Sequence, residues 1–350
     1  MDAHAMTGAG RQPERRGAFD PQPTLTGELV ALRPLRPDDH DALYAVARDP
    51  ELWALHPAKE RATPDGFRRL FDESLATGGA LLITDPGGGE VLGSSRYHGF
   101  DAARDEVEIG WTFLARRCWG GAHNTELKRL MIGHAARFVR TVVFHVHGSN
   151  LRSQRAVEKL GAVRDPLPAG TVIAADTRLT YRLPAFDIRV DDLSGPDVAA
   201  LLAEHLASMH GHSPPGTVHA LGLERLRAPD VTFWCVRQRG ELVGCGALRQ
   251  LDARHGELKS MRTAAAHLRR GVAAALLRHM LAEARARGYR RVSLETGSGP
   301  AFEPAQALYR RFGFERCPPF ADYRDDGFSV CLTLALTTDD SSSHQTGGRP

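Results

Sequence analysis

Short apolar runs and longer segments of helical periodicity follow one another along this chain in an order that occurs twice. In the first half, apolar or alternating runs predict strands at 29–33, 80–84, 91–98, 106–114, 142–146 and 177–183. Apolar residues at spacings of three and four predict helices at 38–48, 65–76, 121–140 and 153–160. Most of these strands follow one another directly, and one long helix crosses between two of them.

The second half repeats this order after Pro184. Strands are expected at 186–190, 232–237, 241–249, 256–263, 291–296 and 328–336, and helices at 194–209, 221–227, 268–287 and 303–312. Each half therefore indicates an α+β (mixed α/β) sandwich, with a central, mostly antiparallel sheet flanked by helices. We expect two tandem domains, 23–184 and 185–336, between disordered tails at 1–22 and 337–350.

Composition narrows the class of protein. Apolar residues make up 42% of the 350 positions and charged residues 25%, which is typical of a soluble globular protein. The formal charge of +3 is small and dispersed, so we expect no nucleic-acid partner. Without a run of 18 apolar residues or a signal-peptide pattern, we expect a cytoplasmic protein that does not enter a membrane.

The cysteines and histidines do not form a recognisable metal or nucleophile pattern. The five cysteines lack Cys-x-x-Cys spacing, which predicts free thiols. Cys118 lies between Arg117 and a predicted helix start, which favours a lowered thiol pKa, but no base is paired with it. His145 and His147 alternate on one strand without a carboxylate or thiol partner at ligand spacing. We therefore expect no metal, and structural or solvent-facing roles for the histidines.

Two turns of small and basic residues open the two longest helices. The first contains Arg117, Gly120, Gly121 and Ala122, which fit a basic-x-x-Gly-x-small form. The second has its glycine 151 positions later, with Leu268 in the basic position, and it consists of Arg269, Arg270, Gly271, Val272 and Ala273. Such a turn presents unpaired N–H groups at the positive end of a helix dipole, which suits a diphosphate. An ordinary helix start is the alternative for either turn alone.

With these turns, the chain resembles the GCN5-related N-acetyltransferase (GNAT) superfamily over 24–183 and 186–336, as a tandem pair. Residues 106–111, 119–121 and 150–153 of the first half resemble the branch of ribosomal-protein N-terminal acetyltransferases. Residues 256–261 and 307–314 of the second half resemble small-molecule acetyltransferases. The resemblance implies that the turns bind the diphosphate of acetyl-CoA, which serves as acyl donor, and that no metal takes part.

Two glutamates are the candidate bases. An alkyl ammonium must lose a proton before its nitrogen attacks a thioester, and a carboxylate at a strand end can accept that proton. Glu108 and Glu257 each lie on the strand before a turn. The alternative for each is a solvated strand charge.

Three further residues complete the candidate site. Tyr309 lies in the helix where the superfamily places the acid that protonates the departing thiolate; a packed helix aromatic is the alternative. Sliding the halves by 152 positions places Val157 opposite Tyr309, so the first half lacks this acid. Asn150 and Ser153 either bond the pantetheine or thiol end of the donor or cap the helix that begins there.

The leading hypothesis is an enzyme, an acyl-CoA-dependent N-acetyltransferase that acts on a primary amine by direct attack. The acceptor would be a small-molecule amine or a protein N-terminus. The first alternative is an acyl-CoA-binding module in which one or both domains are sensors or scaffolds without turnover. A weaker alternative is a tandem acetyltransferase like mycothiol synthase. The segment 210–215 is a candidate for acceptor specificity, since it lies where the superfamily forms the acceptor entrance.

Overall fold

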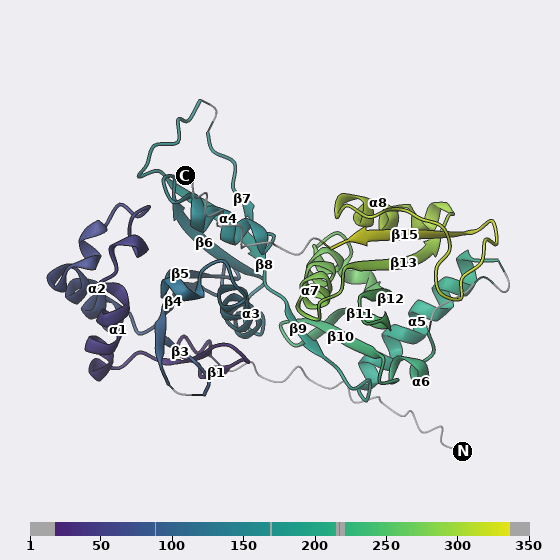
Figure 1. Cartoon of the computed structure of the whole chain (residues 1–350), viewed down its shortest axis with the longest axis horizontal. Helices are drawn as coiled ribbons and strands as arrows, with labels where there is room; N and C mark the ends of the chain where they lie inside the picture. Colours follow the sequence, from purple (N-terminus) through teal and green to yellow (C-terminus); the bar gives the residue numbers. More distant parts are fainter. Residues whose placement is uncertain (1–17, 88, 169, 215–216, 218–220, 337–350) are drawn as a thin grey trace, which may run out of the picture.

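The computed structural model describes residues 18–87, 89–168, 170–214, 217 and 221–336. These residues form two sheets, and the chain passes from the first to the second between Pro184 and Asp187 (Figure 1). The first sheet has the order β1-β2-β3-β4-β5-β6-β8-β7. Its strands are β1 Leu25–Thr26, β2 Ala31–Pro34, β3 Ala80–Thr84, β4 Val91–Asp101, β5 Glu106–Leu114, β6 Thr141–His147, β7 Val163–Arg164 and β8 Arg178–Pro184.

The second sheet repeats this plan without a counterpart of the short β1. Its order, within the described residues, is β14-β15-β13-β12-β11-β10-β9. In both sheets one neighbouring pair is parallel and the others are antiparallel, which confirms the expected fold class. The strands are β9 Asp187–Val190, β10 Val231–Gln238, β11 Glu241–Asp252, β12 His255–Thr263, β13 Arg291–Gly297, β14 Glu315–Arg316 and β15 Ser329–Ala335.

Helices cover both faces of each sheet. They are α1 His40–Ala47, α2 Pro64–Ala76, α3 His123–Ala135, α4 Leu151–Lys159, α5 Pro196–His212, α6 Leu223–Leu226, α7 Val272–Ala286 and α8 Glu303–Arg311. Apolar side chains of α3 and α4 pack on one face of the first sheet, and those of α1 and α2 pack on the other. The second sheet is covered in the same way by α7 and α8 on one face and by α5 and α6 on the other. None of the helices in the described ranges is long and apolar enough to cross a membrane.

The two domains superpose in sequence with an offset of 149 from β5 to α3, not the 151 expected from their glycines. Strand β12 begins 149 residues after β5, and α7 begins 149 residues after α3. Gly120 therefore corresponds to Arg269, and both have positive φ, +70° and +62°. Ala122 corresponds to Gly271. Matching glycine with glycine misled the sequence comparison, because a left-handed turn residue in the second domain is an arginine.

The expected tail at 1–22 overlaps the described residues, and its last part packs on the first domain. Phe19 stacks on Phe100 with ring centroids 4.8 Å apart and meets the edge of Tyr97 at 5.4 Å. The carbonyl of Asp20 lies 2.8 Å from Nε2 of His134. Residues 18–22 therefore pack on the first domain through the ring of Phe19 and the carbonyl of Asp20. Residues 1–17 and 337–350 lie outside the described residues.

The faces covered by α3 and by α7 look toward each other across the junction of the domains (Figure 1). Gln238, at the end of β10, donates from Nε2 to the carbonyl of Ala185 at 2.9 Å. Arg239 pairs with Asp105 of the first domain at 2.8 Å. The guanidinium of Arg278 on α7 lies directly over Gly161, where a Cβ would come within 2.4 Å of its Cζ. These contacts hold the two domains against each other.

Candidate functional site

Each domain has one pair of parallel strands whose backbones are hydrogen-bonded to each other only at one end of the pair. Strand β5 pairs with β6 through Glu106–Glu108, and β12 pairs with β13 through His255–Leu258. Beyond these residues each pair separates, and side chains from both strands line a cavity. The sequence predicts the strands, but their separation is a property of the sheet.

A bulge lies where each pair separates. Trp111 on β5 and Ser260 on β12 occupy corresponding places and have φ of +49° and +52°. The pairing of β4 with β5 and of β11 with β12 is shifted beside these residues. A non-glycine residue in the left-handed region is costly unless its surroundings require it, and such residues gather at functional sites. The residues after the bulges are Thr112 and Met261.

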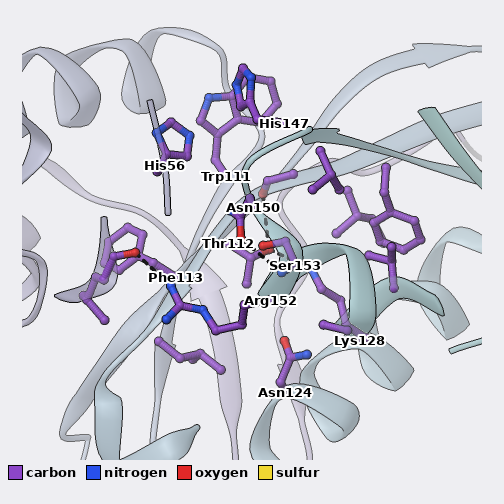
Figure 2. Close-up of a pocket in the computed structure, with 18 of the residues that line it drawn as sticks. His56, Trp111, Thr112, Phe113, Asn124, Lys128, His147, Asn150, Arg152 and Ser153 are labelled. Atoms are coloured by element: carbon purple, nitrogen blue, oxygen red, sulfur yellow. Dashed lines mark hydrogen bonds between the residues drawn. The ribbon is translucent and has the colours of Figure 1, made fainter. Parts of the chain in front are cut away.

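The first cavity has a volume of about 270 Å³ and extends from the turn at Gly120 to the separated strands. Figure 2 shows Asn150, Ser153, Thr112 and Lys128 gathered around it. The side chain of Asn150 accepts a hydrogen bond from the N–H of Ser153 at 3.1 Å, so Asn150 caps α4. Two predicted site residues, Asn150 and Ser153, thus line one cavity with the predicted turn.

Lys128 is a residue of this cavity that the sequence analysis missed. It extends from α3, is 5% exposed, and donates from Nζ to Oγ1 of Thr112 at 2.6 Å (Figure 2). Burial lowers the pKa of Lys128 to about 7. The signal in the sequence was a lysine among the apolar positions of an amphipathic helix, in a chain where lysine is rare.

The second cavity, of about 380 Å³, is lined by Tyr309, Ser260 and Met261 among others. Tyr309 is 8% exposed and donates from its hydroxyl to Sδ of Met261 at 3.6 Å. Burial raises the pKa of Tyr309, so the phenol keeps its proton throughout the neutral range. Tyr309 is thus both a packed aromatic and a lining residue.

Glu257 is fully buried beneath the wall of this cavity. Its Oε1 accepts a hydrogen bond from the hydroxyl of Tyr323 at 2.5 Å, and that hydroxyl accepts one from Nζ of Lys259, also at 2.5 Å. Lys259 lines the cavity. Glu257 is therefore connected to the cavity through Tyr323 and Lys259. The sequence analysis missed Tyr323, which comes from the segment between α8 and β15.

Glu108 occupies the corresponding place in the first domain, and it too lies behind the cavity wall. It is 9% exposed, with Nη2 of Arg178 at 3.7 Å and Nε2 of His145 at 4.0 Å from Oε2. Burial raises the pKa of Glu108, and the charges of Arg178 and Arg96 oppose that shift. His145 lines the cavity and is thus the lining residue beside this carboxylate.

The two turns leave their helix starts open. Apart from the chain neighbours, no atom of the described residues lies within 4 Å of a Cβ placed on Gly120, and the nearest to one on Gly271 is Cγ of Pro184 at 3.7 Å. Arg117 pairs with Glu90 at 2.6 Å, with both side chains more than half exposed. The other turn residues are exposed or half-buried apart from Val272, which is buried; they are Gly121, Ala122, Arg269, Arg270 and Ala273. The offset of 149 places Trp119, rather than Arg117, opposite Leu268.

The remaining candidates give a mixed outcome. Cys118 is 3% exposed, and burial raises its thiol pKa despite the opposing charge of Arg117, so the expected lowering is wrong. Among the described residues no group of three His, Cys, Asp or Glu side chains could hold a metal ion. His205, His212 and Ser213 line the second cavity. Pro215, in the predicted specificity segment, lies outside the described residues.

Comparisons with known proteins match both domains. The model of the acetyltransferase (GNAT) domain matches residues 30–163, and that of the acetyltransferase (GNAT) family matches residues 199–314. The uncharacterized N-acetyltransferase YsnE of Bacillus subtilis is 58% identical over 43% of this chain and 99% of its own length. YedL of Escherichia coli, another uncharacterized N-acetyltransferase, is 52% identical over 43% of this chain and 95% of its own length. The IAA acetyltransferase of Azospirillum brasilense is 35% identical over 40% of this chain and 92% of its own.

Solved structures of the same kind are similar to parts of the chain. A GCN5-related N-acetyltransferase from Brucella melitensis covers 60% of this chain and 98% of its own, with 18% identity and a TM-score of 0.41. The match to a GNAT family acetyltransferase from Elizabethkingia anophelis, with acetyl-CoA bound, covers 43% of this chain and 98% of that protein, with 18% identity and a TM-score of 0.33.

Proposed function

Because this chain belongs to the GNAT family of acetyltransferases, we propose that it transfers the acetyl group of acetyl-CoA to a primary amine by direct attack on the thioester. The chain is an N-acetyltransferase with acetyl-CoA as donor, which agrees with the expectation from its sequence. The observation that carries the direct mechanism is the first cavity, which extends from an open helix start to a pair of separated strands.

Donor binding would use backbone groups more than side chains. The diphosphate would lie at the N-terminus of α3 or α7, where free N–H groups and the helix dipole favour negative charge. Arg117 in the first domain, and Arg269 and Arg270 in the second, are exposed and can add charge-assisted bonds. The thioester would then extend between the separated strands, near the bulge residues Trp111 and Ser260.

The amine proton would leave through the groups in front of each glutamate. In the second domain the path is from the cavity to Lys259 or Tyr323 and then to Glu257, whose carboxylate accepts from Tyr323 at 2.5 Å. In the first domain the path would pass through His145, which lines the cavity and lies 4.0 Å from Glu108. The attacking nitrogen forms a bond to the acyl carbon, the carbon–sulfur bond breaks, and the electron pair goes to sulfur. In the second domain Tyr309 supplies the proton to that sulfur.

The acceptor would enter the second cavity beside α5, where His205 and His212 lie. Burial lowers the pKa of His205 to about 4, so this side chain is neutral at physiological pH. A small-molecule amine and a protein N-terminus both satisfy the chemistry. The acceptor classes are therefore best separated by a turnover panel.

A matched pair of substitutions tests the proposal. Ala122→Asp and Gly271→Asp each place a carboxylate at the corresponding helix start, where it repels a diphosphate. By calorimetry, the unaltered chain should bind two CoA molecules, each single variant one, and the double variant none. Thiol release from acetyl-CoA with a panel of amines should fall in the variant whose domain uses the amine. No thiol release with any amine, from folded protein, would refute the transferase function.

The second candidate function, an acyl-CoA-binding domain without turnover, is favoured for the first domain by Val157, which stands where the second domain has Tyr309. CoA binding by the Gly271→Asp chain without thiol release would support it. Amine-dependent thiol release from that chain would exclude it.

A further inference from the structure

The two domains carry different polar side chains at corresponding places on their two inner helices. On the fourth helix of each domain, Tyr309 of α8 corresponds to Val157 of α4. On the third helix the difference is reversed, because Lys128 of α3 corresponds to Leu277 of α7. Val157 and Leu277 are both buried in the apolar core of their domain. At these two pairs of corresponding positions, each domain thus has one proton-bearing side chain, but on a different helix.

Both groups reach the same point of the sheet. Nζ of Lys128 lies 2.6 Å from Oγ1 of Thr112, and the hydroxyl of Tyr309 lies 3.6 Å from Sδ of Met261. Thr112 and Met261 are corresponding residues, each directly after the left-handed residue of the bulge. Lys128 and Tyr309 also line the cavities of their own domains. Lys128 and Tyr309 come from different helices, but their polar ends therefore lie at corresponding places in the two sites.

The burial of Lys128 requires an explanation beyond stability. The ammonium is buried against Thr112 and lies 5.7 Å above the ring of Phe144, and no carboxylate of the described residues forms an ion pair with it. A lone buried ammonium costs free energy, and an apolar residue such as the Leu277 of the other domain fills this place without that cost. A charge held at such a cost beside a cavity indicates a functional role.

We propose that Lys128 donates the proton that neutralises the departing CoA thiolate in the first domain, as Tyr309 does in the second. This inference rests on the proposed transferase function. When the carbon–sulfur bond breaks, sulfur takes the electron pair and Lys128 gives it one proton, which forms the thiol. Lys128 then recovers a proton equivalent to the one that the attacking amine has lost. The products are the amide and CoA, with no further reactant.

The acid strength of Lys128 suits this step. A group whose pKa is about 7 gives its proton readily to a thiolate whose conjugate thiol has a pKa near 8.5. An ordinary lysine, with a pKa near 10.4, holds its proton more tightly than Lys128 does. Burial of the lysine thus makes it a usable acid at neutral pH.

Other titratable groups line the same cavity from the elements around Lys128. They are Cys118 from η4 (Arg116–Cys118), His145 and His147 from β6, Arg152 from α4, and His56 and Arg61 from the connection between α1 and α2. Lys128 itself owes its lowered pKa to burial. Burial also lowers the pKa of His56, to about 4, with Arg61 and His147 contributing. His56 is therefore not an acid at neutral pH.

The test uses the full chain with Gly271→Asp, which confines donor binding to the first domain. Lys128→Met should lower kcat by about 10²-fold, with KM for acetyl-CoA changed far less. In the unaltered first domain, kcat should fall as the pH rises through about 7, because Lys128 loses the proton that it donates. Lys128→Met should lack this decline. Lys128→Arg keeps the charge but not the acid, so its kcat should also be low.

A second readout does not depend on turnover. The ultraviolet absorbance of the thiolate gives the thiol pKa of bound CoA, and it should be lower in the unaltered chain than with Lys128→Met, because the ammonium stabilises the anion. Leu277→Met, in the Ala122→Asp chain, is the matched control and should leave second-domain kcat unchanged.

Three results would overturn the inference. They are equal kcat and pH dependence with and without Lys128, an unchanged thiol pKa of bound CoA, and acetylation of Lys128 by the donor, found as an added acetyl mass. A failure of the function itself looks different, because then neither the unaltered chain nor any variant releases thiol from acetyl-CoA.

Discussion

The two domains share one arrangement of strands and inner helices but place their proton-bearing groups on different helices. In the second domain Tyr309 extends from α8 to Met261, and in the first Lys128 extends from α3 to Thr112. In both domains the group reaches the strand residue that follows the bulge, but it extends from a different helix in each. A site in this fold is therefore better recognised by its position relative to the strand than by matching helix motifs.

The two carboxylates show the opposite relation. Glu108 and Glu257 correspond in sequence position but differ in their surroundings. Glu257 is bonded to Tyr323, while Glu108 has His145 and Arg178 near it. A shared position fixed by the parallel strand pairing thus leads to two different connections with the cavity. Substitutions at these residues test how much each difference affects turnover.

The largest effect is expected from Glu257→Gln in the chain that carries Ala122→Asp. The amide cannot accept the amine proton, so second-domain kcat should fall by about 10³-fold. Steady-state thiol release measures this loss. Glu303→Gln, an exposed carboxylate on α8, is the control and should have no effect. Unchanged turnover with Glu257→Gln would show that this carboxylate does not accept the amine proton.

Tyr309→Phe in the same chain should lower kcat by about 10²-fold, since the thiolate then leaves without its acid. Burial raises the pKa of Tyr309, so the phenol stays protonated and second-domain kcat should not decline as the pH rises through 7. First-domain kcat should decline as the pH rises through 7, because the pKa of Lys128 is about 7. Identical pH profiles for the two domains would contradict the comparison of their acids.

Lys128→Met should raise the free energy of unfolding by about 2 kcal/mol at neutral pH, because a buried charge is replaced by an apolar side chain of similar length. The folded-state pKa of about 7 lies below the ordinary value of 10.5, so the unfolded chain binds more protons between these values. The gain should therefore be largest below about pH 7 and shrink as the pH rises toward 10.5. Urea unfolding at several pH values measures it.

The exposed Lys159 of α4 provides the control for that experiment, since Lys159→Met removes a charge without changing the core. A destabilised Lys128→Met chain would mean that the hydrogen bond to Thr112 outweighs the burial of the charge.

The smallest effect is expected at the domain junction. Gln238→Ala removes the hydrogen bond to the carbonyl of Ala185 and should lower the free energy of unfolding by about 1 kcal/mol. Turnover in both domains should stay the same, because the contact lies away from both cavities. Gln250→Ala, at an exposed position, is the control. A loss of activity in either domain would reveal coupling between them.

The sequence analysis predicted the long elements well and the short ones poorly. Runs such as 106–114 and 256–263 have a clear period and lie within a residue of β5 and β12. The two-residue strands β1, β7 and β14 were missed, because two residues have no period. The tail prediction failed at Phe19, whose packing depends on rings from β4 and beyond α3 that are far away in sequence.

The order of strands and helices, their doubling, and the small-residue turns were determined by the sequence alone, because each follows from local periodicity and backbone preference. The partners of the candidate groups were decided only by the tertiary structure. Lys128 and Thr112 are 16 residues apart, Tyr309 and Met261 are 48, and Tyr323 and Glu257 are 66. Such pairs meet because a strand bulge, a helix face and a loop converge, and no local pattern encodes that meeting.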